Sequence, residues 1–194
     1  SRGLGDVYKR QILACGTSLH AGWVGKYLLE QLAGIPTLVQ YASEFRYAPT
    51  PPCHRMLTIG VTQSGETTDT LAALEAEQNQ RAGLAPELQA RLVGITNRPE
   101  NTISRVVEHV IAAQAGIEIS VAATKSFTTQ LLAFYGLAIE LGAQRGHLSR
   151  DRVTELVAGL RGLPPKIERI LETQNSHIEQ LAHQFNPVSY THLR

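Results

Sequence analysis

Five short, largely apolar runs alternate with segments of helical periodicity, and this alternation constrains the fold more than any other feature of the sequence. Continuous apolar runs of this kind are typical of parallel strands that are buried on both faces. Because helical segments separate the runs, we expect a five-stranded parallel sheet between two layers of helices, which is a three-layer αβα sandwich of the α/β class. The expected strands are residues 12–15, 37–41, 56–62, 91–96 and 109–113.

Helices are expected between the strands and after the last one. Apolar residues recur at helical spacing in residues 19–32, and residues 66–81 are expected to form the next long helix. A short helix is expected after residue 42, with Ser43 as its N-cap. A second short helix is expected after Pro99, up to about Arg105. A long helix is expected from Val121 or Ala122 to Leu141, and two further helices at residues 151–160 and 165–184.

Composition argues against several classes of protein. The formal net charge is only +1, so no broad electrostatic attraction to nucleic acid or to an anionic membrane is expected. No apolar run reaches the roughly 18 residues that a membrane-spanning helix needs. The two cysteines, Cys15 and Cys53, form no CxxC pair, which favours a reduced, cytoplasmic protein. No spacing typical of a metal site, such as HExxH, is present.

Three segments rich in hydroxyls and small residues follow expected strands: residues 15–18, 62–67 and 120–125. The carboxyl ends of parallel strands meet at one edge of a sheet, beside helix N-termini that offer free N–H groups and a partial positive charge. Thr62, Gln63, Ser64 and Thr67 surround one such strand-to-helix turn, and Gly65 allows that turn to curl. The sequence therefore predicts a phosphate cradle, although neither a Walker P-loop nor a dinucleotide fingerprint is present.

The same residue types also have structural explanations. Serine and threonine often begin helices simply as N-caps, so capping and phosphate binding both remain open for Ser64, Thr67, Thr17 and Ser18. A glutamate in the first helical turn, such as Glu66, is most simply explained by the helix dipole, because a carboxylate would repel a phosphate.

Four motifs together resemble the isomerase domain of glutamine–fructose-6-phosphate aminotransferases. They are ACGTS at residues 14–18, ASEFRY at 42–47, TQSGETTDTLAAL at 62–74 and ISVAATKSFTTQ at 119–130. The resemblance extends over about residues 12–185 and implies the SIS (sugar isomerase) fold. It also implies a reaction that converts fructose 6-phosphate and glutamine into glucosamine 6-phosphate and glutamate, with neither a metal nor an organic cofactor.

The resemblance assigns site residues position by position. Thr62, Gln63, Ser64 and Thr67 match the phosphate-binding residues, Thr17 and Ser18 match sugar and phosphate contacts, and Val121 matches a position whose backbone touches the sugar. Two positions depart from the family pattern. Thr62 replaces a frequent serine and keeps the hydroxyl, whereas Ala123 replaces a frequent serine and loses a donor to the sugar.

The resemblance implies no catalytic residue in this chain. The family's acid–base glutamate, Schiff-base lysine and ring-opening histidine belong to a second SIS domain, and its nucleophilic cysteine belongs to a glutaminase domain. Residues 1–11 and 187–194 match the periodicity of neither neighbour and are expected to be non-native tails. Between them we expect an SIS domain at 12–146 and linking helices at 147–186 toward the second SIS domain. Alone, the chain is expected to bind fructose 6-phosphate or glucosamine 6-phosphate weakly without turnover. In the full enzyme, the isomerase half is expected to form a homodimer.

Three other functions are compatible with parts of the sequence. A non-catalytic SIS module that senses a sugar phosphate would need no base, but no basic face or helix-turn-helix supports a regulator. A one-domain sugar-phosphate isomerase would need its own base, for which Glu44 and Glu66 are the candidates near the expected edge. A nucleotide-binding, flavodoxin-like protein is a more distant alternative.

Overall fold

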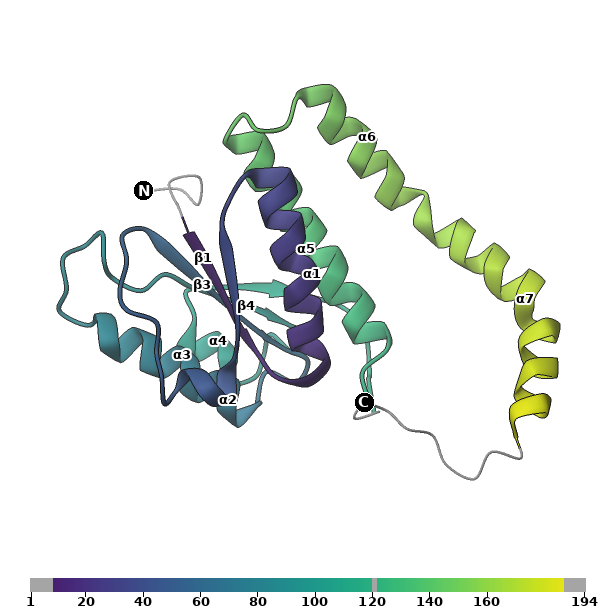
Figure 1. Ribbon diagram of the computed structural model, residues 1–194, viewed down its shortest axis with the longest axis horizontal. Coiled ribbons are helices and arrows are strands. Elements are labelled where there is room, and N and C mark those ends of the chain that lie inside the picture. Colours follow the sequence, from purple (N-terminus) through teal and green to yellow (C-terminus); the bar gives the residue numbers. More distant parts are fainter. Residues whose placement is uncertain (1–8, 120–121, 187–194) are drawn as a thin grey trace. The chain divides into compact units, whose positions relative to one another are not determined.

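The computed structural model describes residues 9–119 and 122–186, and it contains a five-stranded sheet in which every strand is parallel to its neighbours (Figure 1). The order of the strands is β2-β1-β3-β4-β5. Their bounds are β1 Lys9–Ala14, β2 Thr37–Tyr41, β3 Met56–Thr62, β4 Leu92–Thr96 and β5 His109–Ala112. This sheet, with helices on both of its faces, confirms the predicted α/β sandwich.

The helices form two layers on the sheet. Helices α1 and α5 pack on each other over one face, whereas α3 packs with α2 and α4 on the other side (Figure 1). Two further helices, α6 and α7, follow the sheet domain. Their bounds are α1 Gly16–Ala33, α2 Ala42–Phe45, α3 Thr68–Arg81, α4 Ile103–Val106, α5 Lys125–Gln144, α6 Arg150–Arg161 and α7 Leu163–Phe185.

Successive side chains of β1 point to opposite faces of the sheet and so contribute to two hydrophobic cores. Ile12 and Ala14 pack in the cluster formed with α1 and α5, whereas Leu13 packs with Phe45 of α2 and Ala73 of α3. The close approach of α1 and α5 depends on a small residue. A Cβ at Gly25 would stand 2.4 Å from the ring of Phe134, so a larger side chain here would force these two helices apart.

The strand order creates a topological switch point between β1 and β3. The chain leaves β1 for β2 on one side, whereas β3 leads to β4 on the other side. In open parallel sheets, the connections at such a point diverge and leave a crevice outside the carboxyl ends of the strands. The connections that diverge here are β1–α1 and β3–α3, which contain the first two of the predicted cradle segments.

Several predicted bounds were wrong. Strand β1 begins at Lys9 rather than residue 12, because backbone pairing of Arg10 with Thr37 and Leu57 continues beyond the apolar run. Ser43 lies inside α2, and Tyr41 occupies the N-cap. Helix α3 begins at Thr68 and α5 at Lys125, both later than predicted, because polar turns precede them.

The chain divides into two compact units between Ser149 and Arg150. In the second unit, every described residue of α7 is exposed, including apolar side chains along the helix. Those apolar residues are Leu163, Ile167, Ile170, Leu171, Ile178, Leu181 and Phe185. Among the helices in the described part of the chain, none is long and apolar enough to cross a membrane.

Candidate functional site

A pocket of about 230 Å³ lies at the carboxyl ends of β1 and β3, at the switch point of the sheet. Three parts of the chain meet there: the β1–α1 connection, the β3–α3 connection and the residue just before the N-cap of α5. No charged side chain lines the pocket among the described residues. Its lining residues are Cys15, Gly16, Thr17, Ser18, Gln63, Ser64, Thr67 and Ala123.

The pocket brings together five of the seven residues predicted from the sequence: Thr17, Ser18, Gln63, Ser64 and Thr67. Thr62 does not line it. Its side chain is buried behind Thr67, with its Oγ1 2.7 Å from the Thr67 Oγ1. Val121 lies outside the described residues. Cys15, which belongs to the first predicted segment but was not among the predicted site residues, lines the pocket between β1 and α1.

Side chains do not cap the two helices that begin at the pocket. Cys15 is the N-cap of α1 and Thr67 is the N-cap of α3, and neither side chain accepts a hydrogen bond from its helix. The Ser64 hydroxyl instead accepts a hydrogen bond of 3.1 Å from the Glu66 N–H, within the turn. Because the first N–H groups of a helix have no intrahelical acceptor, both helices direct donors and the positive ends of their dipoles toward this region.

The turn formed by residues 63–66 is held by the β4–α4 connection. The carbonyl oxygen of Gln63 accepts from the Asn97 N–H at 3.1 Å, and that of Gly65 accepts from the Ile103 N–H at 3.1 Å. The Asn101 side-chain amide donates to the Ser64 carbonyl at 2.7 Å. These bonds direct three carbonyl oxygens toward a connection that does not line the pocket, so these acceptors are engaged outside it.

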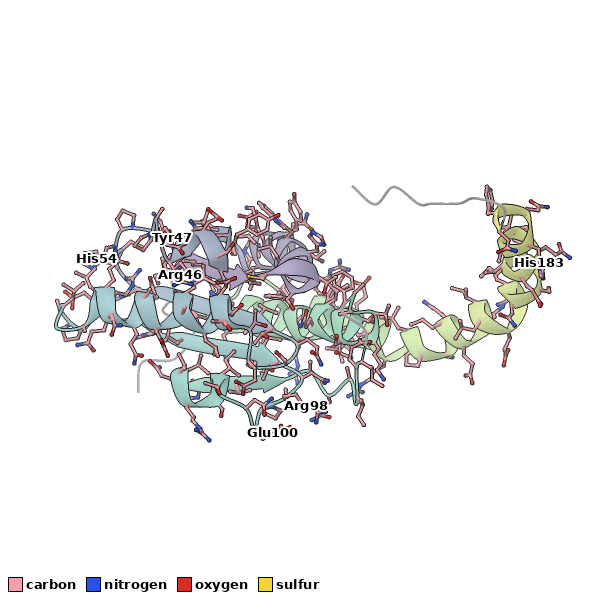
Figure 2. The ribbon with its side chains drawn as sticks, turned by 90° about the horizontal axis from the view of Figure 1, so that it is seen from below. Arg46, Tyr47, His54, Arg98, Glu100 and His183 are labelled. Carbon is pink, nitrogen blue, oxygen red and sulfur yellow. The ribbon has the colours of Figure 1, made fainter. Side chains whose placement is uncertain are left out.

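Gly65 has a backbone φ of +73°, which other residue types rarely adopt. A Cβ at this position would stand 3.0 Å from both the Arg98 carbonyl oxygen and the Asn101 Cβ. Arg98 in the same connection forms an exposed ion pair with Glu100, with 3.4 Å between Nη1 and Oε1 (Figure 2). A side chain at this position would therefore crowd the connection in addition to straining the backbone.

The carboxylate of Glu66 is bound outside the pocket. It accepts hydrogen bonds from the N–H of Thr102 at 2.7 Å and from the Thr102 hydroxyl at 2.8 Å. The Thr102 N–H, followed by its hydroxyl, lowers the pKa of Glu66 below its ordinary value because both donors favour the ionised form. This carboxylate therefore secures the turn to the β4–α4 connection and is not among the groups that line the pocket.

The third side of the pocket is fixed by Glu118 and Asn97. One oxygen of the Glu118 carboxylate accepts hydrogen bonds from the Thr124 N–H, the Ser126 N–H and the Ser126 hydroxyl, at 3.2, 3.0 and 3.0 Å. These donors lower the pKa of Glu118, with the Ser126 N–H contributing most. The Asn97 amide bonds to the backbone of Ala115 and Gly116 at 2.6 and 2.7 Å. Hydrogen bonds therefore hold the chain on both sides of Ala123: Asn97 holds the backbone at residues 115–116, and Glu118 holds the start of α5.

A buried amide–hydroxyl pair supports the pocket from behind. The Gln130 side-chain amide in α5 donates to the Ser18 Oγ in α1 at 3.1 Å. Sequence reasoning placed both residues in motifs but did not pair them, because 112 residues separate them and no local pattern reveals the contact.

The arrangement is suited to binding an acceptor-rich anion. Hydroxyls, a side-chain amide and helix N-termini surround the pocket, and such preorganised dipoles stabilise negative charge without a charged side chain. No side chain that could act as a carboxylate, imidazole or amine base lines the pocket among the residues that the structure describes.

Comparisons with known proteins agree with this geometry. The model of the SIS domain family matches residues 4–140. The chain is 63% identical over 182 residues to a glutamine–fructose-6-phosphate aminotransferase of Thermosynechococcus vestitus, covering 94% of this chain and 29% of that protein. It is 60% identical over 175 residues to the enzyme of the same name from Synechocystis, covering 90% of this chain and 28% of that protein. The chain therefore spans less than a third of the length of these relatives.

A solved structure of a protein of the same kind also resembles this chain. The C-terminal domain of glucosamine-fructose-6-phosphate aminotransferase from Francisella tularensis superimposes with a TM-score of 0.86 at 30% sequence identity, covering 95% of this chain and 50% of that one. The resemblance inferred from four short motifs thus extends over nearly the whole chain. With a family model that matches most of its length and a sheet of the expected topology, this chain belongs to the SIS domain family.

Proposed function

We propose that this chain is a sugar-phosphate-binding SIS domain of a glutamine–fructose-6-phosphate aminotransferase, and that its pocket holds the phosphate of fructose 6-phosphate or glucosamine 6-phosphate. The observation that carries the proposal is the uncharged pocket at the β1/β3 switch point, where five predicted donor residues meet two helix N-termini without side-chain caps. A phosphate there would accept hydrogen bonds from the Ser64 and Thr67 hydroxyls and from backbone N–H groups.

In this proposal, the chain binds and orients the sugar but does not transfer its protons. Ring opening and proton transfer between C1 and C2 require a positioned base. Glu66 is bonded to Thr102, and Glu44 does not line the pocket, so neither candidate base of a one-domain isomerase is placed to act there. The resemblance assigns the glutamate, lysine and histidine of the reaction to a second SIS domain. The cytoplasmic location and the homodimer stay predictions.

Calorimetric titration of the purified chain with glucosamine 6-phosphate tests the proposal. Glucosamine and inorganic phosphate serve as ligand controls, because the proposal requires both halves of the ligand for full affinity. Thr67→Ala and Ser64→Ala should each weaken binding by about 2- to 12-fold, the range for one hydrogen bond, and by more where the acceptor is charged. Thr173→Ala, an exposed threonine in α7, is the matched control. A folded chain that binds none of these ligands would contradict the proposal.

A further inference from the structure

In the buried hydrogen bond between Gln130 and Ser18, the glutamine is the donor, and this leaves the serine proton free to point elsewhere. Gln130 is 1% exposed and Ser18 is 7% exposed, so water competes little for this hydrogen bond. The nitrogen of a side-chain amide can only donate, so the Ser18 Oγ is the acceptor. Its single hydroxyl proton therefore remains available for a second partner.

The pocket lies beside that proton, because Ser18 is one of the lining residues. Among the described residues, the Ser18 hydroxyl accepts from Gln130 and donates to no protein acceptor. A buried hydroxyl without an acceptor is costly, whereas a ligand oxygen in the pocket would satisfy it. The pair thus presents a donor to the ligand.

We infer that Gln130 is a positioning residue: by donating to Ser18 from behind, it fixes the Ser18 hydroxyl as a donor toward the oxygen atoms of a bound sugar phosphate. This inference rests on the proposed function and adds a residue that does not itself touch the ligand. The Gln130–Ser18 hydrogen bond also joins the first turn of α1 to the second turn of α5, so it connects two helices that border the pocket.

Substituting Gln130 with groups of different hydrogen-bonding character tests the inference. Gln130→Met keeps the length of the side chain but removes the donor, so the Ser18 hydroxyl is free to rotate. Gln130→Glu keeps the shape and replaces the donor with an acceptor, which would draw the Ser18 proton away from the pocket and add a negative charge near the ligand. Gln144→Met and Gln144→Glu, at an exposed position of the same helix, are matched controls.

The readout is the dissociation constant for glucosamine 6-phosphate and for inorganic phosphate, measured by calorimetry, together with each variant's melting temperature. We expect Gln130→Met to weaken binding about threefold and Gln130→Glu by more than about tenfold, with no change in the Gln144 variants. The ratio of wild-type to Gln130→Glu affinity should shrink as the pH falls, because a protonated carboxyl can donate again. A residue that only supports packing would not produce this pH-dependent ratio.

A double-mutant cycle with Ser18→Ala separates the outcomes. If Gln130 acts through Ser18, adding Gln130→Met to the Ser18→Ala variant should weaken ligand binding little further. If Ser18→Ala weakens binding but both Gln130 variants bind like the wild type, the inference about Gln130 is overturned and the proposed function stands. Additive losses would likewise overturn it. If the unmodified, folded chain binds neither ligand, the proposed function fails and the inference fails with it.

Discussion

The hydroxyl oxygens of Thr62 and Thr67 lie 2.7 Å apart, and only Thr67 lines the pocket. Either hydroxyl can donate to the other. An anion in the pocket would accept the Thr67 proton, and Thr62 would then donate to Thr67. In the proposed site, Thr62, which the resemblance marks as a direct phosphate contact, would instead support the Thr67 hydroxyl from behind.

Replacing Thr62 with valine should weaken ligand binding without disturbing the fold. Thr62→Val keeps the branched shape but removes the hydroxyl behind Thr67, so glucosamine 6-phosphate affinity should fall by about 2- to 12-fold. Thr62→Ser should restore it. Thr37→Val, at a buried threonine of β2 away from the pocket, controls for general stability. Calorimetric affinities that are equal in wild type and Thr62→Val would show that Thr62 has no supporting role.

Gly65→Ala should destabilise the protein through both backbone strain and crowding. Alanine at a positive φ costs more than about 1 kcal/mol, and here its Cβ would also press on Arg98 and Asn101. Gly83→Ala isolates the first effect, because Gly83 has a φ of +75° but open space around it. Urea denaturation of both variants should show the larger loss for Gly65→Ala. Equal losses would mean that the β4–α4 connection does not confine the turn.

The hydrogen bonds of Glu118 predict a specific pH dependence. The pKa of Glu118 is lowered in the folded state, so its contribution to stability is present above the unfolded pKa of about 4.5 and is lost as the pH falls through the folded value. Glu118→Gln should therefore be less stable than wild type at neutral pH, and the difference should shrink in acid. Denaturation of Glu172→Gln, an exposed glutamate of α7, is the control. A difference that is independent of pH would contradict this role.

How much the sequence predicts differs between elements. Strands β2 and β3 have the predicted bounds, because apolar runs and flanking breakers are local signals. The start of α3 was predicted two residues early because Gly65 and the Ser64–Glu66 hydrogen bond keep the chain in a turn. The start of α5 was predicted early because Glu118, seven residues upstream, binds its first N–H groups. Pairs such as Gln130 with Ser18 form only when distant segments meet.

Strand β1 shows a second limit of sequence reasoning. The family match begins at residue 4 and the strand begins at Lys9, so the backbone here is part of the sheet. The side chains of Arg10 and Gln11 fit poorly, because both are buried and neither has a hydrogen-bond partner for its polar side-chain atoms among the described residues. Burial lowers the pKa of Arg10 to about 10, and the nearby Arg145 contributes less. The apolar-run signal missed the first residues of β1 because their side chains are polar, although their backbone pairs in the sheet.

Arg10→Leu should therefore stabilise the chain. Removing an unpaired buried charge and filling the space with an apolar side chain should raise the free energy of unfolding by more than about 1 kcal/mol. Lys9→Leu, at the neighbouring exposed position of β1, controls for adding a leucine to this strand. If urea denaturation finds Arg10→Leu no more stable than wild type, the guanidinium has a partner that the described residues do not include.

Binding of a sugar phosphate in the pocket at the ends of β1 and β3 can be measured by an amide NMR titration with glucosamine 6-phosphate. Hydrogen bonds to the phosphate should shift the N–H signals of Gly16, Thr17 and Ser18 and those of Ser64 through Thr67, in a saturable manner. Glucosamine alone should shift them far less. Shifts confined to other parts of the molecule, such as the second unit after Ser149, would contradict the account.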